Sequence, residues 1–295
     1  MTHATILIPT FRHASVLPYS IRSVLAQEGV EFELFVVGDG VEGDTRAAVE
    51  PFLADDRVRF FDLPKGVGSG ERNRHEALRE ARGEIVCYVS DDDILLPGFL
   101  EEMTGLLAAA DFAHPLPVSV HPGGRVEYRP ADLARPEFFS LIRRGLNNFI
   151  SLTGATHTRT AYEQLPEGWR PAPPGVGSDI NMWRQFVELP QFRGRTGTRL
   201  TAIHFPNPEW RLVDPVERAA ELARWLDLAA APGGREKLDR VLEVAIRTAA
   251  QDFKLRSIEL QRALDDVRRA REARPSARVR RTVRRLAGGR GLRRQ

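Results

Sequence analysis

Four short apolar runs in the first 90 residues constrain the fold of this chain more than any other feature. Each run is rich in β-branched or aromatic residues, and segments of helical character separate them. They span residues 5–9, 33–37, 58–61 and 84–90. Strands that alternate with helices in this way predict an α/β fold with a doubly wound, mostly parallel sheet and helices on both faces.

The segments between these runs have the spacing or the end signals of helices. Apolar residues recur at helical spacing in residues 16–25, and residues 45–53 are compatible with a short helix despite Pro51. Residues 71–82 follow a glycine-rich loop at residues 66–70. They end at Gly83, a residue type that often closes helices. The sequence therefore repeats a strand-then-helix unit.

Carboxylates stand directly after two of the expected strands. Asp39 follows the second run, and Asp91, Asp92 and Asp93 follow the fourth. Ligands of doubly wound sheets bind at the carboxyl ends of the strands, so we expect these side chains in a binding crevice. Three adjacent carboxylates repel one another unless a proton or a cation intervenes, and Mg²⁺ or Mn²⁺ suits such oxygen ligands. The alternative is a solvated acidic turn that caps a helix starting near Pro97.

Helical signals dominate the C-terminal part. Asp214 before Pro215, with Glu217 at capping-box spacing, predicts a helix that runs to about Ala231. A longer helix is expected to continue to Pro275, with one apolar face. The domains that we expect are a catalytic domain at 1–212, with a nucleotide-binding half at 1–110 and an acceptor-side half at 111–212, a helical extension at 213–274 and a basic, disordered tail at 275–295.

The net charge is unevenly distributed along the chain. The whole chain carries +3, but residues 268–295 contain twelve Arg and one Glu, a net charge of +11, which leaves −8 on the rest. A basic tail on an acidic body indicates an anionic partner such as a membrane surface, and a solvated, disordered end is the alternative. Because the tail lacks interleaved aromatic residues, we expect no specific nucleic-acid partner.

Composition also bears on the compartment. No stretch approaches the roughly 18 apolar residues that a transmembrane helix needs, and the N-terminus has no signal-peptide pattern. We therefore expect the protein in the cytoplasm, with peripheral attachment to the inner membrane face through its tail as a further expectation. The single cysteine, Cys87, lies in the fourth apolar run, which favours a buried hydrophobic role over a catalytic thiol.

Five motifs, in order, resemble those of family 2 glycosyltransferases with the GT-A fold, over about Thr5–Trp210. They are the first strand and loop at Ile6–Phe11, the second strand and its acid at Val36–Gly40, the pair Arg72–Asn73, the DxD-like Ser90–Asp93 ahead of Pro97, and the pair Ser178–Asp179 before a helix.

The resemblance implies roles for individual residues. Asp92 matches the principal metal ligand of the DxD signature, and Asp179 matches the acid that serves as general base, although a plain helix N-cap is the alternative for Asp179. Asp93 and His204 are candidates for further metal ligands, and a partly buried histidine with satisfied hydrogen bonds is the alternative for His204. The nucleotide-binding residues implied are Pro9, Thr10, Phe11, Asp39, Arg72 and Asp91.

The chain also departs from the family pattern. Gly38, Ser90 and Ser178 stand where many members have acidic residues. One carboxylate therefore remains in each motif, which leaves the nucleotide and the metal affinity open.

The reaction implied is an in-line displacement at the anomeric carbon, with a divalent metal steadying the departing nucleoside diphosphate. The donor would be a nucleotide-sugar, UDP- or dTDP-linked, and the acceptor a carbohydrate, a lipid-linked or a small-molecule hydroxyl. Such a bacterial-type enzyme would serve cell-surface polysaccharide, glycolipid or secondary-metabolite synthesis. The configuration at the sugar would invert.

Three alternatives remain open on the sequence. Residues 38–43 match the G-x-G-x-x-G fingerprint of an NAD(P)-dependent oxidoreductase, although Asp39 would point its charge at a pyrophosphate. A metal-dependent nucleotidyltransferase would share the fold class and the acidic cluster. A non-catalytic nucleotide-binding module is the third alternative.

Overall fold

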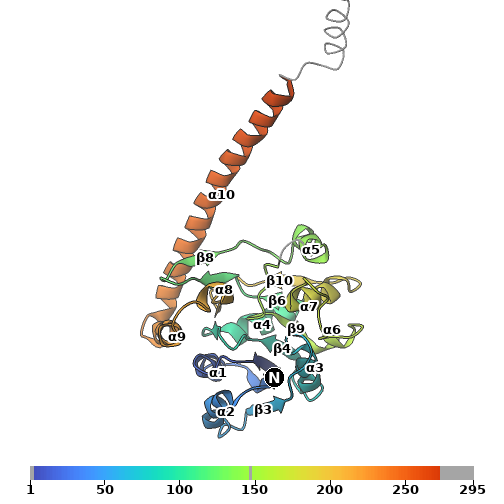
Figure 1. Ribbon diagram of the computed structural model, residues 1–295, viewed down its shortest axis with the longest axis vertical. Helices are drawn as coiled ribbons and strands as arrows, with labels where there is room; N and C mark the ends of the chain where they lie inside the picture. The colour runs from blue at the N-terminus through green and yellow to red at the C-terminus, as the bar shows by residue number, and fades with distance from the viewer. Residues whose placement is uncertain (1–2, 146–147, 273–295) are drawn as a thin grey trace, which may run out of the picture. The chain divides into compact units, whose positions relative to one another are not determined.

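The computed structural model describes residues 3–145 and 148–272 (Figure 1). The chain divides into two compact units, one that ends at Ile246 and one that begins at Arg247. The first unit contains all the strands of the described residues, and the second is helical where it is described.

A seven-stranded sheet forms the centre of the first unit, in the order β10-β6-β9-β4-β1-β2-β3. All of its pairings are parallel except those of β9 with its two neighbours. The α/β fold with a mostly parallel sheet is thus confirmed. The strands of this sheet are β1 (His3–Thr10), β2 (Glu31–Asp39), β3 (Val58–Leu63), β4 (Ile85–Tyr88), β6 (Phe112–His114), β9 (Thr156–Thr158) and β10 (Gly194–Thr196).

Two smaller antiparallel sheets complete the strands. They pair β5 (Ile94–Leu95) with β11 (Ala202–Ile203) and β7 (Val118–Val120) with β8 (Val126–Tyr128). The helices are α1 (Leu17–Leu25), α2 (Gly43–Val49), α3 (Glu71–Leu78), α4 (Phe99–Leu107), α5 (Pro136–Arg143), α6 (Arg159–Glu163), α7 (Ser178–Val187), α8 (Asn207–Trp210), α9 (Pro215–Ala230) and α10 (Gly234–Glu272).

The alternation of side chains along β1 explains why helices cover both faces of the sheet. Ile6 and Ile8 lie in a core cluster with residues of α1 and α4, whereas Leu7 lies in a second cluster with residues of α3 and α7. Successive side chains of a strand point to opposite faces, so a strand that is apolar at every position needs cover on both.

The expected helix at 45–53 is broken into two parts. α2 ends at Val49, and a 3₁₀ turn follows at Glu50–Phe52. Pro51 has no backbone N–H to continue the α-helical ladder, so the chain tightens there. The helix expected at 71–82 is also shorter, because α3 ends at Leu78 and the chain turns so that the Arg82 N–H reaches the buried Glu33 carboxylate.

The C-terminal helices begin as part of the first unit. Leu222 and Trp225 of α9 and Leu238 of α10 are buried in a third core cluster with Val16 and Trp210. The Asp214 carboxylate accepts a hydrogen bond from the Val216 N–H at 2.8 Å, which confirms the predicted N-cap of α9. Compact packing therefore continues to Ile246, past residue 212 where we expected the catalytic domain to end.

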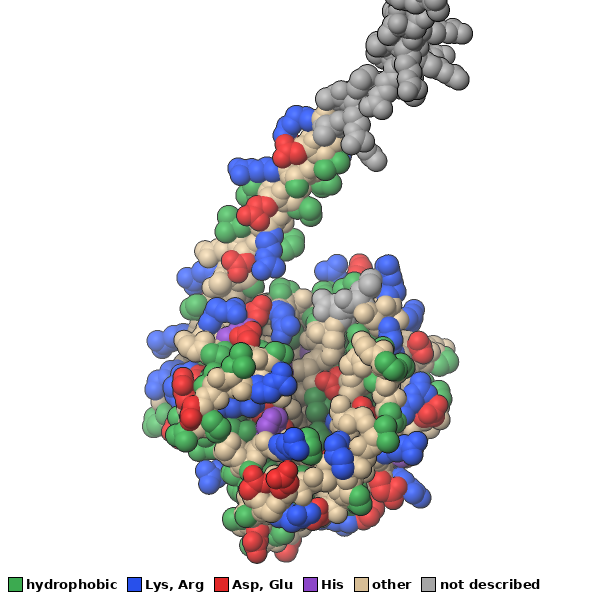
Figure 2. All heavy atoms as spheres, viewed as in Figure 1, with side chains coloured by type: hydrophobic (Ala, Val, Ile, Leu, Met, Phe, Trp, Pro, Cys, Tyr) green, Lys and Arg blue, Asp and Glu red, His purple; other side chains and the backbone are tan. Residues whose placement is uncertain are grey.

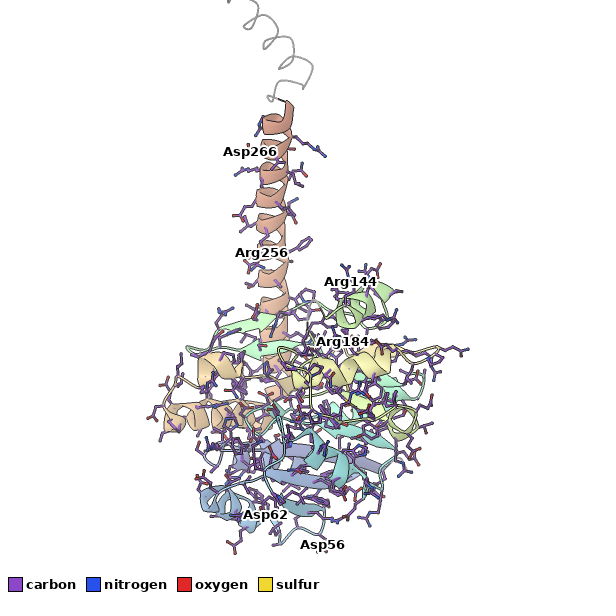
Figure 3. All side chains as sticks on the ribbon, turned by 45° about the vertical axis from the view of Figure 1, so that its right-hand side comes forward. Asp56, Asp62, Arg144, Arg184, Arg256 and Asp266 are labelled. Atoms are coloured by element: carbon purple, nitrogen blue, oxygen red, sulfur yellow. The ribbon has the colours of Figure 1, made fainter. Side chains whose placement is uncertain are left out.

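In the second unit, α10 exposes side chains on all sides. Figure 3 shows Arg256 and Asp266 extending away from the helix, and Figure 2 shows apolar and charged side chains interspersed along it. Phe253, although on the face expected to be apolar, is exposed. No helix in the described part of the chain is both long and apolar enough to cross a membrane. The basic tail expected at 275–295 lies outside the described residues.

Candidate active site

The order of the strands reverses between β1 and β4, the place where sheets of this kind form a ligand crevice. The chain runs outward through β1, β2 and β3, and then returns so that β4 pairs with the other side of β1. Neighbouring loops diverge at such a reversal, which is where open α/β sheets bind ligands. Residues 11–16 after β1 and residues 89–93 after β4 meet there. The carboxyl ends of the strands thus bring the expected residues together.

Asp39 lies at one side of this crevice and accepts hydrogen bonds from the loop that follows β3. Its carboxylate is buried, accepts from the Gly66 N–H at 2.7 Å and from Asn73 Nδ2 at 2.8 Å, and is paired with Lys65. Gly70, which precedes α3, has a φ of +78°, and a Cβ there would lie 3.1 Å from the Asp39 Cβ. The glycine-rich loop is therefore packed closely against Asp39, which was predicted to bind the nucleotide.

The fingerprint at 38–43 has another explanation in this fold. Gly40 has a φ of +71°, and a Cβ there would lie 2.6 Å from the Lys65 Cβ. The segment also follows β2 and not the first strand of the sheet. Glycine at this position is thus required by the approach of the Lys65 loop, without any dinucleotide.

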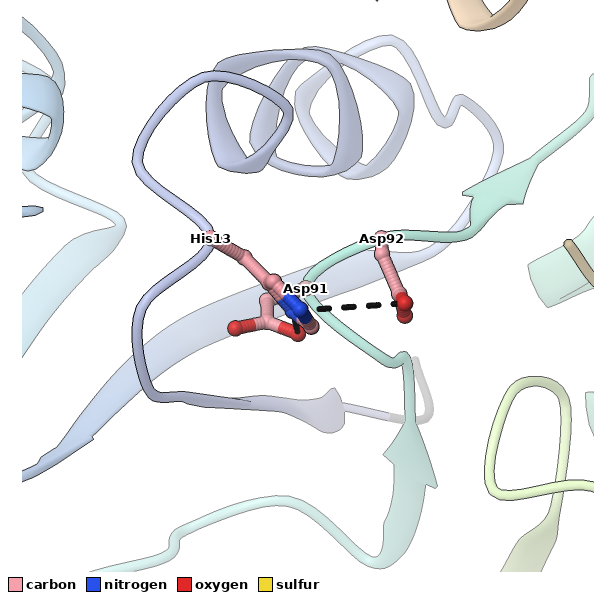
Figure 4. A group of neighbouring side chains, drawn as sticks. All are labelled: His13, Asp91 and Asp92. Atoms are coloured by element: carbon pink, nitrogen blue, oxygen red, sulfur yellow. Dashed lines mark hydrogen bonds and ion pairs between the residues drawn. The ribbon is translucent and has the colours of Figure 1, made fainter. Parts of the chain in front are cut away.

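Asp91 connects the two loops of the crevice. It accepts from the Phe11 N–H at 3.1 Å and lies 2.8 Å from His13 Nδ1. Figure 4 shows His13 on the loop after β1 facing Asp91 and Asp92 on the turn after β4. Burial opposes a charge on His13, but the hydrogen bond to Asp91 and the charges of both carboxylates raise its pKa.

Asp92 is a buried carboxylate of this turn, and its partners come from α8 and α9. Its Oδ2 accepts from Asn207 Nδ2 at 3.3 Å and is paired with the Arg218 guanidinium. Burial, followed by the charges of Asp93 and Asp91, raises the pKa of Asp92 to about 6, while His13 and Arg218 oppose the rise. Ligand atoms of His13, Asp91 and Asp92 all lie within 4.8 Å of one another, which is close enough to share one metal ion.

Asp93 and His204 are brought together, but by hydrogen bonds within the protein. Asp93 accepts from the Phe205 N–H at 2.7 Å and from the Thr153 hydroxyl, and its Oδ2 lies 3.0 Å from His204 Nδ1. Burial opposes a charge on His204, but the Asp93 carboxylate raises the pKa of this imidazole. Both oxygens of Asp93 thus already accept hydrogen bonds from the protein. The roles of Asp93 and His204 as metal ligands remain predictions.

Asp179 lines a cavity of about 220 Å³ next to the Asp91–Asp93 turn. Ser90, Asp93 and His204 line the same cavity. Burial raises the pKa of the Asp179 carboxyl, and the charges of Arg74 and His204 oppose that rise. A carboxylate with a raised pKa in the wall of a cavity is a candidate general base.

Arg74 supports the start of the helix that carries Asp179. Its guanidinium is buried, donates to the Ser178 hydroxyl at 3.2 Å and to the Ser69 carbonyl at 2.6 Å, and lies 4.5 Å from the centre of the Trp169 ring. Desolvation lowers the pKa of Arg74, while the negative charge of Asp179 favours its charged form. This arginine therefore joins the glycine-rich loop to the N-terminus of α7.

The remaining predicted nucleotide residues lie at or just after the end of β1 and on α3. Pro9 and Thr10 end β1, and the exposed Phe11 ring lies 5.0 Å from Lys65 Nζ. Arg72 is on α3, but its side chain is exposed and makes no hydrogen bond or ion pair to residues 3–145 or 148–272.

Several residues at the site were missed on the sequence. His13 stands only two residues after the recognised first motif, so its position was a signal that could have been used. Lys65 and Arg74 flank the recognised glycine-rich loop and the Arg-Asn pair. Nothing in the sequence indicated that Arg218 belongs to the site, because 126 positions separate it from Asp92.

Comparison with known proteins identifies related sequences and structures. The sequence model described as glycosyl transferase family 2 matches residues 5–164. A GalNAc(5)-diNAcBac-PP-undecaprenol beta-1,3-glucosyltransferase of Campylobacter jejuni is 31% identical over 105 residues, 35% of this chain and 34% of that protein. The chain matches about a third of the length of its first curated relatives.

Two solved structures show the same fold. Staphylococcus aureus TarS 1-349 in complex with UDP has a TM-score of 0.54 at 17% identity, over 83% of this chain and 71% of that one. The mannosyltransferase PcManGT of Pyrobaculum calidifontis, in complex with GDP-Man and Mn²⁺, has a TM-score of 0.51 at 17% identity, over 87% of this chain and 80% of that one. The likeness at these identities concerns the fold, which is of the GT-A type.

Proposed function

Because this chain belongs to glycosyl transferase family 2, we propose that it is a glycosyltransferase. In the proposed reaction a sugar moves from a UDP- or dTDP-linked donor to an acceptor hydroxyl, with inversion at the anomeric carbon. One observation carries the proposal. The cavity with Asp179 in its wall lies directly beside the Asp91–Asp93 turn, so a base and a diphosphate site would flank one sugar.

The acceptor is proposed to be a carbohydrate or a lipid-linked saccharide. The name of the Campylobacter relative gives an undecaprenol-linked saccharide as its acceptor, which supports this class. The cavity has both polar and apolar walls, including Asn148, Ser151 and Phe149, as a site for a sugar ring needs.

The residues around Asp92 fit a divalent metal. His13 Nδ1 and the carboxylates of Asp91 and Asp92 form a compact set of one nitrogen and two oxygen ligands, suited to Mn²⁺ or Mg²⁺. Because ligand atoms of Asp91, Asp92 and His13 lie together, we propose Asp92 as the principal ligand, with Asp91 and His13 beside it. When bound, the metal would offset the charge that builds on the departing diphosphate.

The chain's own residues would perform the remaining steps. Asp39, held by Gly66 and Asn73, would accept a hydrogen bond from the nucleotide base. Asp179 would take the proton of the acceptor hydroxyl as that oxygen attacks the anomeric carbon and the bond from the sugar to the diphosphate breaks. Arg74 would keep the base in place through Ser178.

Calorimetric titration of UDP tests the proposal directly. We expect binding with Mn²⁺, and loss of most of it with EDTA or in Asp92→Ala with Mn²⁺, because the carboxylate carries the metal. The control is Asp239→Ala, whose exposed carboxylate pairs with Arg235 on α10, outside all five motifs. If UDP does not bind, GDP and dTDP follow, and failure of all three would reject a nucleotide-sugar donor.

A further inference from the structure

Arg218 is a buried arginine that reaches the candidate metal site from outside the matched part of the family. Its side chain is 7% exposed, and its Nη2 group donates to Asp92, whose side chain is 4% exposed. It belongs to α9, whereas the family model matches only residues 5–164. The positive charge at Asp92 is therefore contributed by the C-terminal part of this chain.

This ion pair competes with a metal for the same carboxylate. Asp92 Oδ2, which accepts from Arg218, also lies 3.9 Å from His13 Nδ1 within the proposed ligand set. A divalent cation at Asp92 and a guanidinium in contact with the same oxygen would repel strongly, because burial reduces screening. A metal can bind well only if Arg218 finds another anion.

Arg218 also has a hydrogen-bond donor that is not used. Its Nε–H is buried and finds no acceptor within residues 3–145 and 148–272. A buried donor without an acceptor is unfavourable, so an anion brought into the site would be stabilised by it. A guanidinium binds phosphate oxygens with two parallel hydrogen bonds, which makes a diphosphate a suitable partner.

We propose that Arg218 occupies Asp92 in place of the metal until the donor arrives, so that the metal binds together with the diphosphate and not before it. The proposal rests on the proposed function, because the diphosphate is that of the nucleotide donor. In the free protein, Arg218 neutralises Asp92 and keeps the Mn²⁺ affinity low. The diphosphate then pairs with Arg218 and releases Asp92 to the metal. By linkage, UDP and Mn²⁺ must strengthen each other's binding by one common factor.

The test measures Mn²⁺ binding to the whole chain by the paramagnetic resonance of free Mn²⁺, with and without UDP. The variants are Arg218→Gln, Arg218→Lys and Arg224→Gln. Arg224 is the matched control, because it lies on the same helix and pairs with Glu221 at the surface. Without UDP, we expect Arg218→Gln to bind Mn²⁺ about tenfold more tightly than wild type, and Arg224→Gln to be unchanged. UDP should strengthen Mn²⁺ binding much less in Arg218→Gln.

If Arg218→Gln does not fold, Arg218→Lys tests the same competition for Asp92. The shorter side chain withdraws the charge from Asp92, and Mn²⁺ affinity without UDP should rise about threefold or more. Unchanged or weaker Mn²⁺ binding in a folded Arg218 variant, or no Mn²⁺ binding by any variant, overturns the proposal.

The outcome is separable from that of the proposed function. Tighter Mn²⁺ binding in the Arg218 variants, without any binding of UDP, would support competition between Arg218 and the metal for Asp92. It would argue against a UDP-linked donor. Sugar transfer together with unchanged Mn²⁺ affinity in those variants would support the proposed function. It would reject the proposal that Arg218 competes with the metal.

Discussion

Asp179 and Arg74 form a pair in which position and charge are both important. Asp179 lies in the cavity wall, where burial raises the pKa of its carboxyl. The charge of Arg74 is the largest effect that lowers this pKa. A general base must be deprotonated, so turnover should fall as the pH drops through the raised pKa of Asp179.

Replacing Arg74 should move this pH dependence. In Arg74→Gln the stabilising charge is lost, the pKa of Asp179 rises further, and the acid limb of turnover should shift upward by about one pH unit. Arg74→Lys keeps the charge and should shift the limb less. The measurement is the pH profile of turnover at saturating donor, and an unmoved limb in Arg74→Gln would argue against this pairing.

Asp179→Asn serves as the control for that profile. It should lower turnover by roughly 10²- to 10⁴-fold and leave UDP binding unchanged, because the amide cannot accept the proton. An Asp179→Asn enzyme that kept both its turnover and its acid limb would exclude Asp179 as the base.

At the level of elements, α9 links the C-terminal part to the site. Leu222 and Trp225 bury one face of this helix, and Arg218 on the same helix reaches Asp92. The helix α9 begins at Pro215, and Arg218 lies in its first turn. A well-formed N-terminus of α9 therefore helps to position Arg218.

The N-cap of α9 gives a stability prediction. Asp214→Ala removes the acceptor of the Val216 N–H and should lower the free energy of unfolding by about 1 kcal/mol, read from urea denaturation. Asp227→Ala, an exposed change on the same helix, should stay within about 0.5 kcal/mol of wild type. Equal losses in the two variants would mean that the cap contributes nothing specific.

At the scale of the whole molecule, charge is separated along the chain. Both signs are interspersed on the face of the first unit shown in Figure 2, whereas residues 268–295 carry +11. Arginines near an anionic bilayer contribute about 1 kcal/mol each at low salt, so the end of the chain is proposed to bind a membrane surface.

Deletion of the residues after Arg274 tests this role. It removes eight arginines and should greatly reduce sedimentation with phosphatidylglycerol vesicles, while UDP binding stays unchanged. Phosphatidylcholine vesicles are the control, since they carry no net charge. Equal sedimentation of the full and the shortened chain would remove the membrane proposal.

Local sequence patterns were sufficient to predict the class of the fold and the edge of the sheet that holds the site. Apolar runs that alternate with helical segments dictate a parallel sheet, and acids after the second and fourth runs must then meet at its carboxyl edge. Asp39, Asp91 and Asp92 could therefore be located in advance, because both the strands and the carboxylates that follow them are local features.

The partner of each of these residues could not be predicted from the sequence and became known from the folded chain. The sequence contains no sign that Arg218 would pair with Asp92, or that Asp93 would be held by Thr153 and Phe205. Contacts between distant positions depend on how whole helices dock, and docking is set by the packing of many side chains together. For that reason the position of the site could be predicted from local sequence patterns. The charged residues that pair with its carboxylates, such as Arg218 with Asp92, are set by the tertiary fold.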